Sequence, residues 1–292
     1  IVIEILESNV KNINDLKKFV RIYKDFGFLI AIDDIGSGSS NLSRIHLLEP
    51  DILKIDMSII RNIDKEFYKQ EVFKSIVNLA KKIGALVVAE GIETESEAST
   101  AFELGADMLQ GYYFIKPQEN IDHHKLDKLA DFVCCSSAQF KNNVLDKYKN
   151  LQNRFKMCHD IIEHIIHELQ SSDIQNLDET LEQFIGIYPP IECIYVLNHS
   201  GMQVSPTVHD KTRLLKQKRI IFKPAPKFTD HSLKDYFLYI KAGMEKYVSE
   251  QYISLATGNL CITVAKSFTA QDGIDYILCV DLSPQNYRCA NE

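Results

Sequence analysis

The stretch FLIAIDDIGSG, residues 28–38, decides how the rest of the chain is interpreted. Five apolar residues run directly into Asp33 and Asp34, and a Gly-Ser-Gly turn follows. The pattern predicts a buried strand that places two adjacent carboxylates at its carboxyl end. Such carboxylates repel each other unless a cation or a proton lies between them, and Mg²⁺ and Mn²⁺ prefer oxygen ligands of this kind. Because Asp and Gly also favour turns for local reasons, an ordinary turn is the alternative.

Apolar runs alternate with amphipathic stretches over residues 1–120. The runs are 1–6, 28–35, 51–56, 85–90 and 108–114. Between them apolar residues recur three and four positions apart, as at Val72, Ile76, Leu79 and Ile83. This alternation predicts a parallel sheet with helical crossovers. In a barrel built this way, the carboxyl ends of the strands carry the chemistry.

Charged and amide side chains lie in these strands or end them. The set is Glu4, Asp33, Asp34, Lys54, Glu90 and Gln110. An inward-pointing charge on a strand rich in Val, Ile and Leu costs free energy unless it is paired or bound to a metal. Recurrence on successive strands favours one shared site. A site with several carboxylates and one lysine needs more positive charge, which two divalent cations would supply while orienting a water against a phosphodiester.

The motifs that carry these residues resemble the EAL family of cyclic-di-GMP phosphodiesterases. They are, in chain order, IEILES (3–8), DDIGSGSSNL (33–42), LKIDMSII (53–60), AEGIET (89–94) and LQGYYFIKP (109–117). The resemblance covers residues 1–120. It implies an α/β fold in which this segment forms the last five strands of a partial TIM-type (βα) barrel.

The resemblance also implies a role for each site residue. The ligands of two divalent cations, Mg²⁺ or Mn²⁺, would be Glu4, Asp33, Asp34 and Glu90. Lys54 would hold and polarise the attacking water, and Gln110 would lie near that water. Glu93 would steady the loop after the aspartate pair, which includes Gly36, Ser37 and Gly38. The residues expected to act in catalysis are thus Lys54, Glu90, Gln110 and Glu93, and the expected product is linear pGpG.

The chain departs from the family pattern in two ways. It begins at Ile1 inside a strand-like run, and it carries neither the Glu-Ala-Leu stretch that names the family nor the family's asparagine ligand. We therefore expect a piece of a longer, active phosphodiesterase, and we expect residues 1–292 alone to be inactive. In addition, Ile35 and Ser39 stand where the family more often has aromatic residues, so a non-catalytic cyclic-di-GMP receptor or sensory dimerisation protein is the alternative function.

Residues 121–172 predict a long helix with a heptad seam. The seam residues are Val144, Tyr148, Leu151, Phe155, Cys158, Ile162, Ile165 and Leu169. Spacing by four and three over more than three heptads is typical of a two-stranded coiled coil, and therefore of a homodimer. An amphipathic helix packed on its own domain is the alternative.

Residues 173–292 predict a second, α+β domain with hairpin turns at TGN (257–259) and QDG (271–273). Its segments SLKDYFLYI, VSEQYISLATGNLCITVAKSF and DYILCVDLS resemble PAS-like and Cache sensory domains. That resemblance implies an antiparallel sheet that cups an unknown small molecule and regulates the enzyme through the helix. We expect ligand contacts from Tyr236, Tyr252, Thr257 and Asp281, with core packing of the tyrosines as the alternative.

Composition limits the remaining possibilities. The 292 residues, 45% hydrophobic and 25% charged, suit an ordinary globular protein of two domains. A net charge of −7 argues against a nucleic-acid polymer as partner. No apolar run approaches the roughly 18 residues that cross a bilayer. Seven scattered cysteines predict reduced thiols, so we expect a cytoplasmic protein without membrane association.

Overall fold

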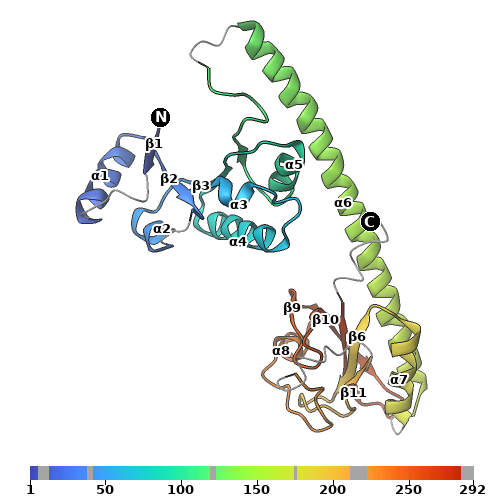
Figure 1. The fold of residues 1–292 in the computed structure, drawn as a ribbon. Coiled ribbons are helices and arrows are strands. Elements are labelled where there is room, and N and C mark those ends of the chain that lie inside the picture. The colour runs from blue at the N-terminus through green and yellow to red at the C-terminus, as the bar shows by residue number, and fades with distance from the viewer. Residues whose placement is uncertain (6–12, 38–41, 119–122, 174–175, 211–221, 284–292) are drawn as a thin grey trace. The chain divides into compact units, whose positions relative to one another are not determined.

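The computed structural model describes residues 1–5, 13–37, 42–118, 123–173, 176–210 and 222–283. This part of the chain divides into two compact units, residues 1–149 and residues 150–292. Each unit contains its own sheet and its own helices (Figure 1).

The first unit is built on a parallel sheet whose five strands lie side by side in chain order. The strands are β1 (Val2–Ile5), β2 (Leu29–Ile35), β3 (Ile52–Ile55), β4 (Leu86–Ala89) and β5 (Met108–Leu109). Between them lie α1 (Ile13–Asp25), α2 (Leu42–Leu48), α3 (Met57–Ile60), α4 (Phe67–Ile83) and α5 (Glu95–Glu103). The predicted alternation and the parallel sheet are confirmed, with one strand in each predicted apolar run.

Two aspartates join neighbouring strands of this sheet by the same contact. Asp51, which precedes β3, accepts a hydrogen bond of 2.8 Å from the backbone N–H of Ile30 in β2. Asp107, which precedes β5, accepts one of 2.8 Å from the backbone N–H of Val87 in β4. Both contacts satisfy a backbone donor at the amino end of the sheet. The polar groups at the carboxyl end are therefore held in a fixed register.

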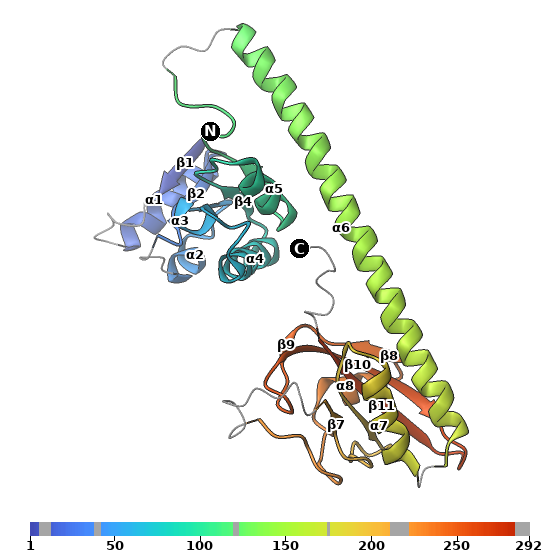
Figure 2. The ribbon, with the colours of Figure 1, turned by 45° about the vertical axis from the view of Figure 1, so that its right-hand side comes forward.

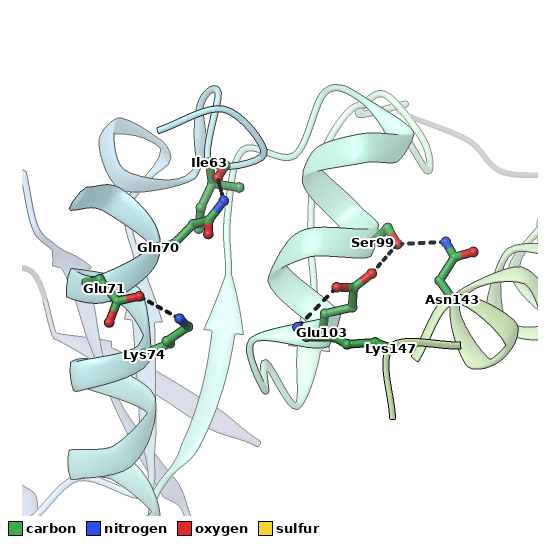
Figure 3. Close-up of polar contacts among 8 residues, drawn as sticks. All are labelled: Ile63, Gln70, Glu71, Lys74, Ser99, Glu103, Asn143 and Lys147. Atoms are coloured by element: carbon green, nitrogen blue, oxygen red, sulfur yellow. Dashed lines mark hydrogen bonds and ion pairs between the residues drawn. The ribbon is translucent and has the colours of Figure 1, made fainter. Parts of the chain in front are cut away.

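A single helix, α6 (His123–Ser171), contributes residues to both units. In the first unit it packs against α5, where the rings of Phe102 and Phe140 lie 5.9 Å apart. Figure 3 shows the polar part of this contact: Asn143 donates to the Ser99 hydroxyl over 3.1 Å, and Lys147 pairs with Glu103 over 3.3 Å. Residues of the predicted linker 121–172 are thus divided between the two units.

The predicted heptad seam on α6 has two environments. Cys158, Ile162, Ile165 and Leu169 are buried in the core of the second unit, whereas Tyr148, Leu151 and Phe155 are exposed. The first group therefore packs on its own domain, as the alternative interpretation expected, because apolar residues three and four apart fit a sheet as well as a second helix. The homodimer stays a prediction.

The second unit is an antiparallel α+β module, which confirms the predicted sheet type. Its sheet has the order β7 (Val208–His209), β6 (Ile191–Leu197), β11 (Asp275–Leu282), β10 (Leu260–Thr269) and β8 (Lys246–Val248), and β9 (Tyr252–Ile253) pairs with β10. The helices α7 (Leu177–Ile187) and α8 (Asp235–Lys241) complete the unit (Figure 2). The PAS-like or Cache class stays a prediction. No helix in the described residues is long and apolar enough to cross a membrane.

Burial on α6 predicts how substitutions change the stability of the second unit. Ile165 is fully buried and Met157 is 42% exposed on the same helix. Ile165→Ala should lower the free energy of unfolding of this unit by about 2–5 kcal/mol, since it leaves a cavity. Met157→Ala should change it by less than about 0.5 kcal/mol. Amide hydrogen exchange of β10 and β11 at increasing urea concentration measures both values, and equal losses would contradict the packing of α6 described above.

Candidate functional site

Lys54 lies at the centre of the candidate site. It is on β3, between the fully buried Leu53 and Ile55. Its Nζ lies 2.8 Å from Glu90 Oε1, 3.0 Å from Glu4 Oε1 and 3.2 Å from Asp33 Oδ1. These carboxylates come from β1, β2 and the residue after β4, so four adjacent strands contribute to one cluster. The structure thus brings these four predicted residues together, and their role in a functional site stays a prediction.

A bulge in β2 places both aspartates opposite the lysine. Ile32 pairs with Leu53 and Ile35 pairs with Ile55, so Asp33 and Asp34 together face one residue of β3. Asp34 has a φ of +59°, in the left-handed region that Asp tolerates better than most residues. Its backbone N–H donates a 3.0 Å hydrogen bond to Asp33 Oδ1. Bulges of this kind re-aim side chains beside active sites, which explains how Asp33 reaches Lys54.

The charges in the cluster do not balance. Burial alone would lower the pKa of Lys54, but hydrogen bonds to Glu90, Glu4 and Asp33 outweigh it and hold the pKa of this ammonium well above its usual range. Burial raises the pKa of Glu90, and although Lys54 opposes this effect, the neighbouring Asp33 carboxylate adds to the rise. One ammonium therefore faces three carboxylates that repel each other. Additional positive charge would stabilise the cluster.

The donor set fits Mg²⁺ or Mn²⁺ in its chemistry, because both ions prefer carboxylate oxygens. Within the described residues, no three carboxylate, imidazole or thiol side chains are arranged to hold a metal ion as they stand. The carboxylates of Glu4, Asp33 and Glu90 converge on one position, and the Lys54 ammonium occupies it. A bound cation would therefore need at least one of these carboxylates to turn away from Lys54.

The backbone places Gln110 next to Glu90 at the edge of the sheet. Its N–H donates to the Ala89 carbonyl over 2.9 Å, and its carbonyl accepts from the Ile92 N–H over 3.1 Å. The following residue, Gly111, is tightly packed, since a Cβ there would lie 2.1 Å from the Ile92 carbonyl oxygen. The Gln110 side chain is exposed, and its role near a water stays a prediction.

The loop after the aspartate pair is described only at its start. Gly36 has a φ of +104°, and a Cβ at this position would lie 2.1 Å from Ile59 Cδ1. Gly36 also accepts a 3.2 Å hydrogen bond from the Ser58 hydroxyl, which ties the loop to α3. Ser37 is exposed, and Gly38 lies outside the described residues.

Glu93 does not make a described contact with that loop. Its carboxylate pairs with Arg61 over 3.3 Å, and both side chains are about half exposed. An exposed pair of this kind contributes little to stability. The role of Glu93 in steadying the loop stays a prediction.

Glu97 is a residue of this region that the sequence analysis missed. Its buried carboxylate accepts hydrogen bonds from the backbone N–H groups of Asn62 (2.9 Å), Glu93 (3.0 Å) and Thr94 (3.1 Å). Burial raises the pKa of Glu97, but these hydrogen bonds outweigh it and the net shift is downward. Glu97 thus fixes the segment that follows Glu90. The signal was the capping-box pattern Thr94-x-x-Glu97, which the structure contains.

Two of the four predicted sensor residues meet in the second unit. Asp281 is fully buried and accepts hydrogen bonds from Tyr252, and also from Thr263, Ser254 and Cys193, at 2.7–3.3 Å. Burial raises the pKa of the Asp281 carboxyl despite these donors.

The other two predicted sensor residues have separate partners. The Tyr236 hydroxyl contacts His231 Nδ1 over 2.5 Å, and Thr257 accepts from the Asn259 N–H over 3.2 Å. Each of the four residues thus has a hydrogen-bond partner within the protein. Packing within the unit, the alternative interpretation, accounts for these contacts without a ligand. Their role in holding a ligand stays a prediction.

Comparison with known proteins agrees with this geometry. Residues 1–117 match the family model of the EAL domain. The EAL-domain protein YkuI of Bacillus subtilis, itself uncharacterised, is 29% identical over 274 residues, which are 90% of this chain and 64% of that protein. The cyclic di-GMP phosphodiesterase PdeF of Escherichia coli is 37% identical over 42% of this chain and 16% of its own length. The chain thus spans less than two thirds of each of these relatives.

A solved structure extends the likeness beyond the EAL match. The crystal structure of Bacillus subtilis YkuI with cyclic-di-GMP and calcium superposes with a TM-score of 0.74 at 26% identity. It covers 97% of this chain and 69% of the YkuI chain. The second unit therefore shares its fold with the corresponding part of YkuI.

Glu97 gives a pH-dependent prediction for the first unit. Glu97→Gln should lower its free energy of unfolding at pH 7 by about 1.5–3 kcal/mol, since charge-assisted hydrogen bonds are lost. The folded pKa lies below the unfolded value of about 4.3, so this stabilisation is present above that pH and is lost as the pH falls through the folded pKa. Urea denaturation at pH 7 and at lower pH should show the gap to wild type closing. The matched control is Glu95→Gln, an exposed residue in the same first turn of α5, and a pH-independent gap would contradict the assignment.

Proposed function

We propose that the protein containing this chain hydrolyses one phosphodiester bond of cyclic-di-GMP, giving linear pGpG, with two divalent cations, Mg²⁺ or Mn²⁺. The observation that carries the proposal is the convergence of Glu4, Asp33 and Glu90 on Lys54 at the carboxyl ends of parallel strands. Support comes from the EAL-domain match and from the YkuI complex with cyclic-di-GMP and calcium.

Each residue has a defined part in this proposal. The carboxylates of Glu4, Asp33, Asp34 and Glu90 would hold the cations, which would supply Lewis-acid polarisation of the phosphodiester and of a water. Lys54 would hold that water, since a nearby ammonium favours the hydroxide form. Gln110 lies near the water, and Glu93 steadies the loop that begins at Gly36 and Ser37. Glu97 acts only by fixing the backbone after Glu90.

The second unit is proposed to regulate this activity as a PAS-like or Cache sensor domain for an unidentified small molecule. The helix α6 supports this part, because it contributes residues to both units. We place the protein in the cytoplasm, as a homodimer.

A receptor without catalytic activity is the second candidate. It is favoured because Lys54, already in contact with three carboxylates, is not free to hold a water as it stands, and because the resemblance puts aromatic residues where this chain has Ile35 and Ser39. A receptor would bind cyclic-di-GMP without turnover, so binding and hydrolysis must both be measured.

Substitutions at the cluster test the catalytic assignment. In a protein that contains this chain together with the missing ligands, Lys54→Ala and Glu90→Ala should each reduce cyclic-di-GMP hydrolysis with Mn²⁺ by about 10²–10³-fold, the range for loss of one preorganised electrostatic contact. The control is Glu71→Gln, which removes only the α4 surface pair with Lys74 shown in Figure 3. Unchanged hydrolysis in both cluster variants would refute the site, and tight binding without turnover in wild type would favour the receptor.

Residues 1–292 alone should show no hydrolysis of cyclic-di-GMP with Mn²⁺. The physical reason is that the resemblance puts two further ligands in sequence that this chain does not contain. Chromatographic detection of pGpG checks this, with a protein that also contains the missing ligands as positive control. Robust turnover by residues 1–292 would show that the described cluster is sufficient.

A further inference from the structure

A pocket of 210 Å³ lies in the second unit, between α6 and the sheet. Its apolar walls come from two elements. The helix provides Leu151, Phe155 and Cys158, and the sheet provides Ile262, Val264 and Leu282. None of these residues belongs to the Lys54 cluster or to the predicted sensor residues.

The pocket lies where the packing between α6 and the sheet of the second unit ends. Along α6 the exposed fraction falls from 57% at Phe155 to 7% at Cys158 and to 0% at Ile162. The helix is therefore fully packed on the sheet from Cys158 onward, and one turn earlier its apolar side chains are left partly uncovered. Apolar surface next to a pocket favours an apolar occupant.

Two cationic side chains, Arg154 and Lys246, also line the pocket, together with Gln251. Arg154 forms no hydrogen bond or ion pair with another described residue. Glu163, which is close enough for Lys246 to lower its pKa, is already paired with Lys266 and with His159. The cations beside the pocket are thus not neutralised by a dedicated acid, and an occupant with an anionic group would complement them.

The charge pattern of α6 argues against a second copy of the chain as occupant. Between residues 144 and 157 the sequence has Lys147, Lys149, Arg154 and Lys156 but only one acid, Asp146. A two-fold axis through this stretch would bring it against itself, whereas a homodimer formed through another surface would not. A pocket volume of 210 Å³ suits a small molecule better than a helix.

We propose that this pocket binds a small amphipathic carboxylate, with its apolar part between α6 and the sheet and its carboxylate held by Arg154 and Lys246. The site is distinct from the predicted sensor residues, because Val264 and Leu282 alternate along their strands with Thr263 and Asp281 and so face the opposite side of the sheet. An occupant would extend the packed length of α6 toward its N-terminus. This inference does not depend on the proposed phosphodiesterase activity.

Isothermal titration calorimetry with three probes tests the proposal. Decanoate, below its critical micelle concentration, and 1-naphthoate represent a flexible chain and a flat ring, and decylamine has the chain length of decanoate with the opposite charge. We expect saturable one-to-one binding of at least one carboxylate and no saturable binding of decylamine. Tighter binding of decanoate would indicate a fatty-acid-like ligand, and tighter binding of 1-naphthoate would indicate an aromatic one.

Variants locate the binding to the pocket. Arg154→Gln and Lys246→Gln should each weaken binding of the preferred carboxylate by about tenfold, since each removes a charge-assisted contact. The matched control is Lys156→Gln, an exposed cation two residues along the same helix that does not line the pocket. It should change the affinity by less than about twofold.

Three results would overturn the proposal. They are no saturable binding of either carboxylate to wild-type protein, equal binding of decylamine, and equal weakening by Lys156→Gln and Arg154→Gln. Circular dichroism of each variant verifies that the fold is kept, which is expected because none of the three charged side chains is buried.

Discussion

The contact of the Lys54 ammonium with three carboxylates is the interaction on which the first unit depends. A buried ammonium in the middle of a strand is costly by itself, and removing the partners of a buried charge typically costs about 3–5 kcal/mol. Lys54 is tolerated because Glu4, Asp33 and Glu90 reach it from neighbouring strands. The same contact leaves excess negative charge at the edge of the sheet. Stability of the sheet and attraction of a cation therefore have one physical origin.

The surrounding backbone holds the charged groups in place with few and identifiable contacts. The bulge in β2 sets Asp33 and Asp34 against a single residue of β3. The Glu97 carboxylate accepts hydrogen bonds from three backbone N–H groups and so fixes the segment after Glu90. At the opposite end of the sheet, Asp51 and Asp107 fix the register of their strands. A site built on strands in this way is more precisely positioned than one built on loops.

The features that could be predicted from the sequence are those set by local patterns of apolar and polar residues. Contacts between residues far apart in the chain could not be predicted. Alternating apolar runs predicted the parallel sheet, and polar residues at the strand ends predicted the cluster around Lys54. The heptad pattern could not decide what covers α6, because the same spacing suits a second helix or the sheet that buries Ile162. The hydrogen bond that Tyr252 donates to Asp281 could not be predicted either, since nothing local places residues of β9 and β11 together. Glu97 could have been found from its capping-box pattern.

The central claim is that the carboxylates around Lys54 form a divalent-cation site. Anomalous diffraction at the manganese edge, from crystals of protein containing residues 1–292 grown with saturating Mn²⁺, tests it most directly. We expect an anomalous peak within coordination distance of Asp33 and Glu90, with at least one carboxylate turned away from Lys54. Saturating Mn²⁺ with no peak there, and with all three carboxylates still in contact with Lys54, would contradict the account.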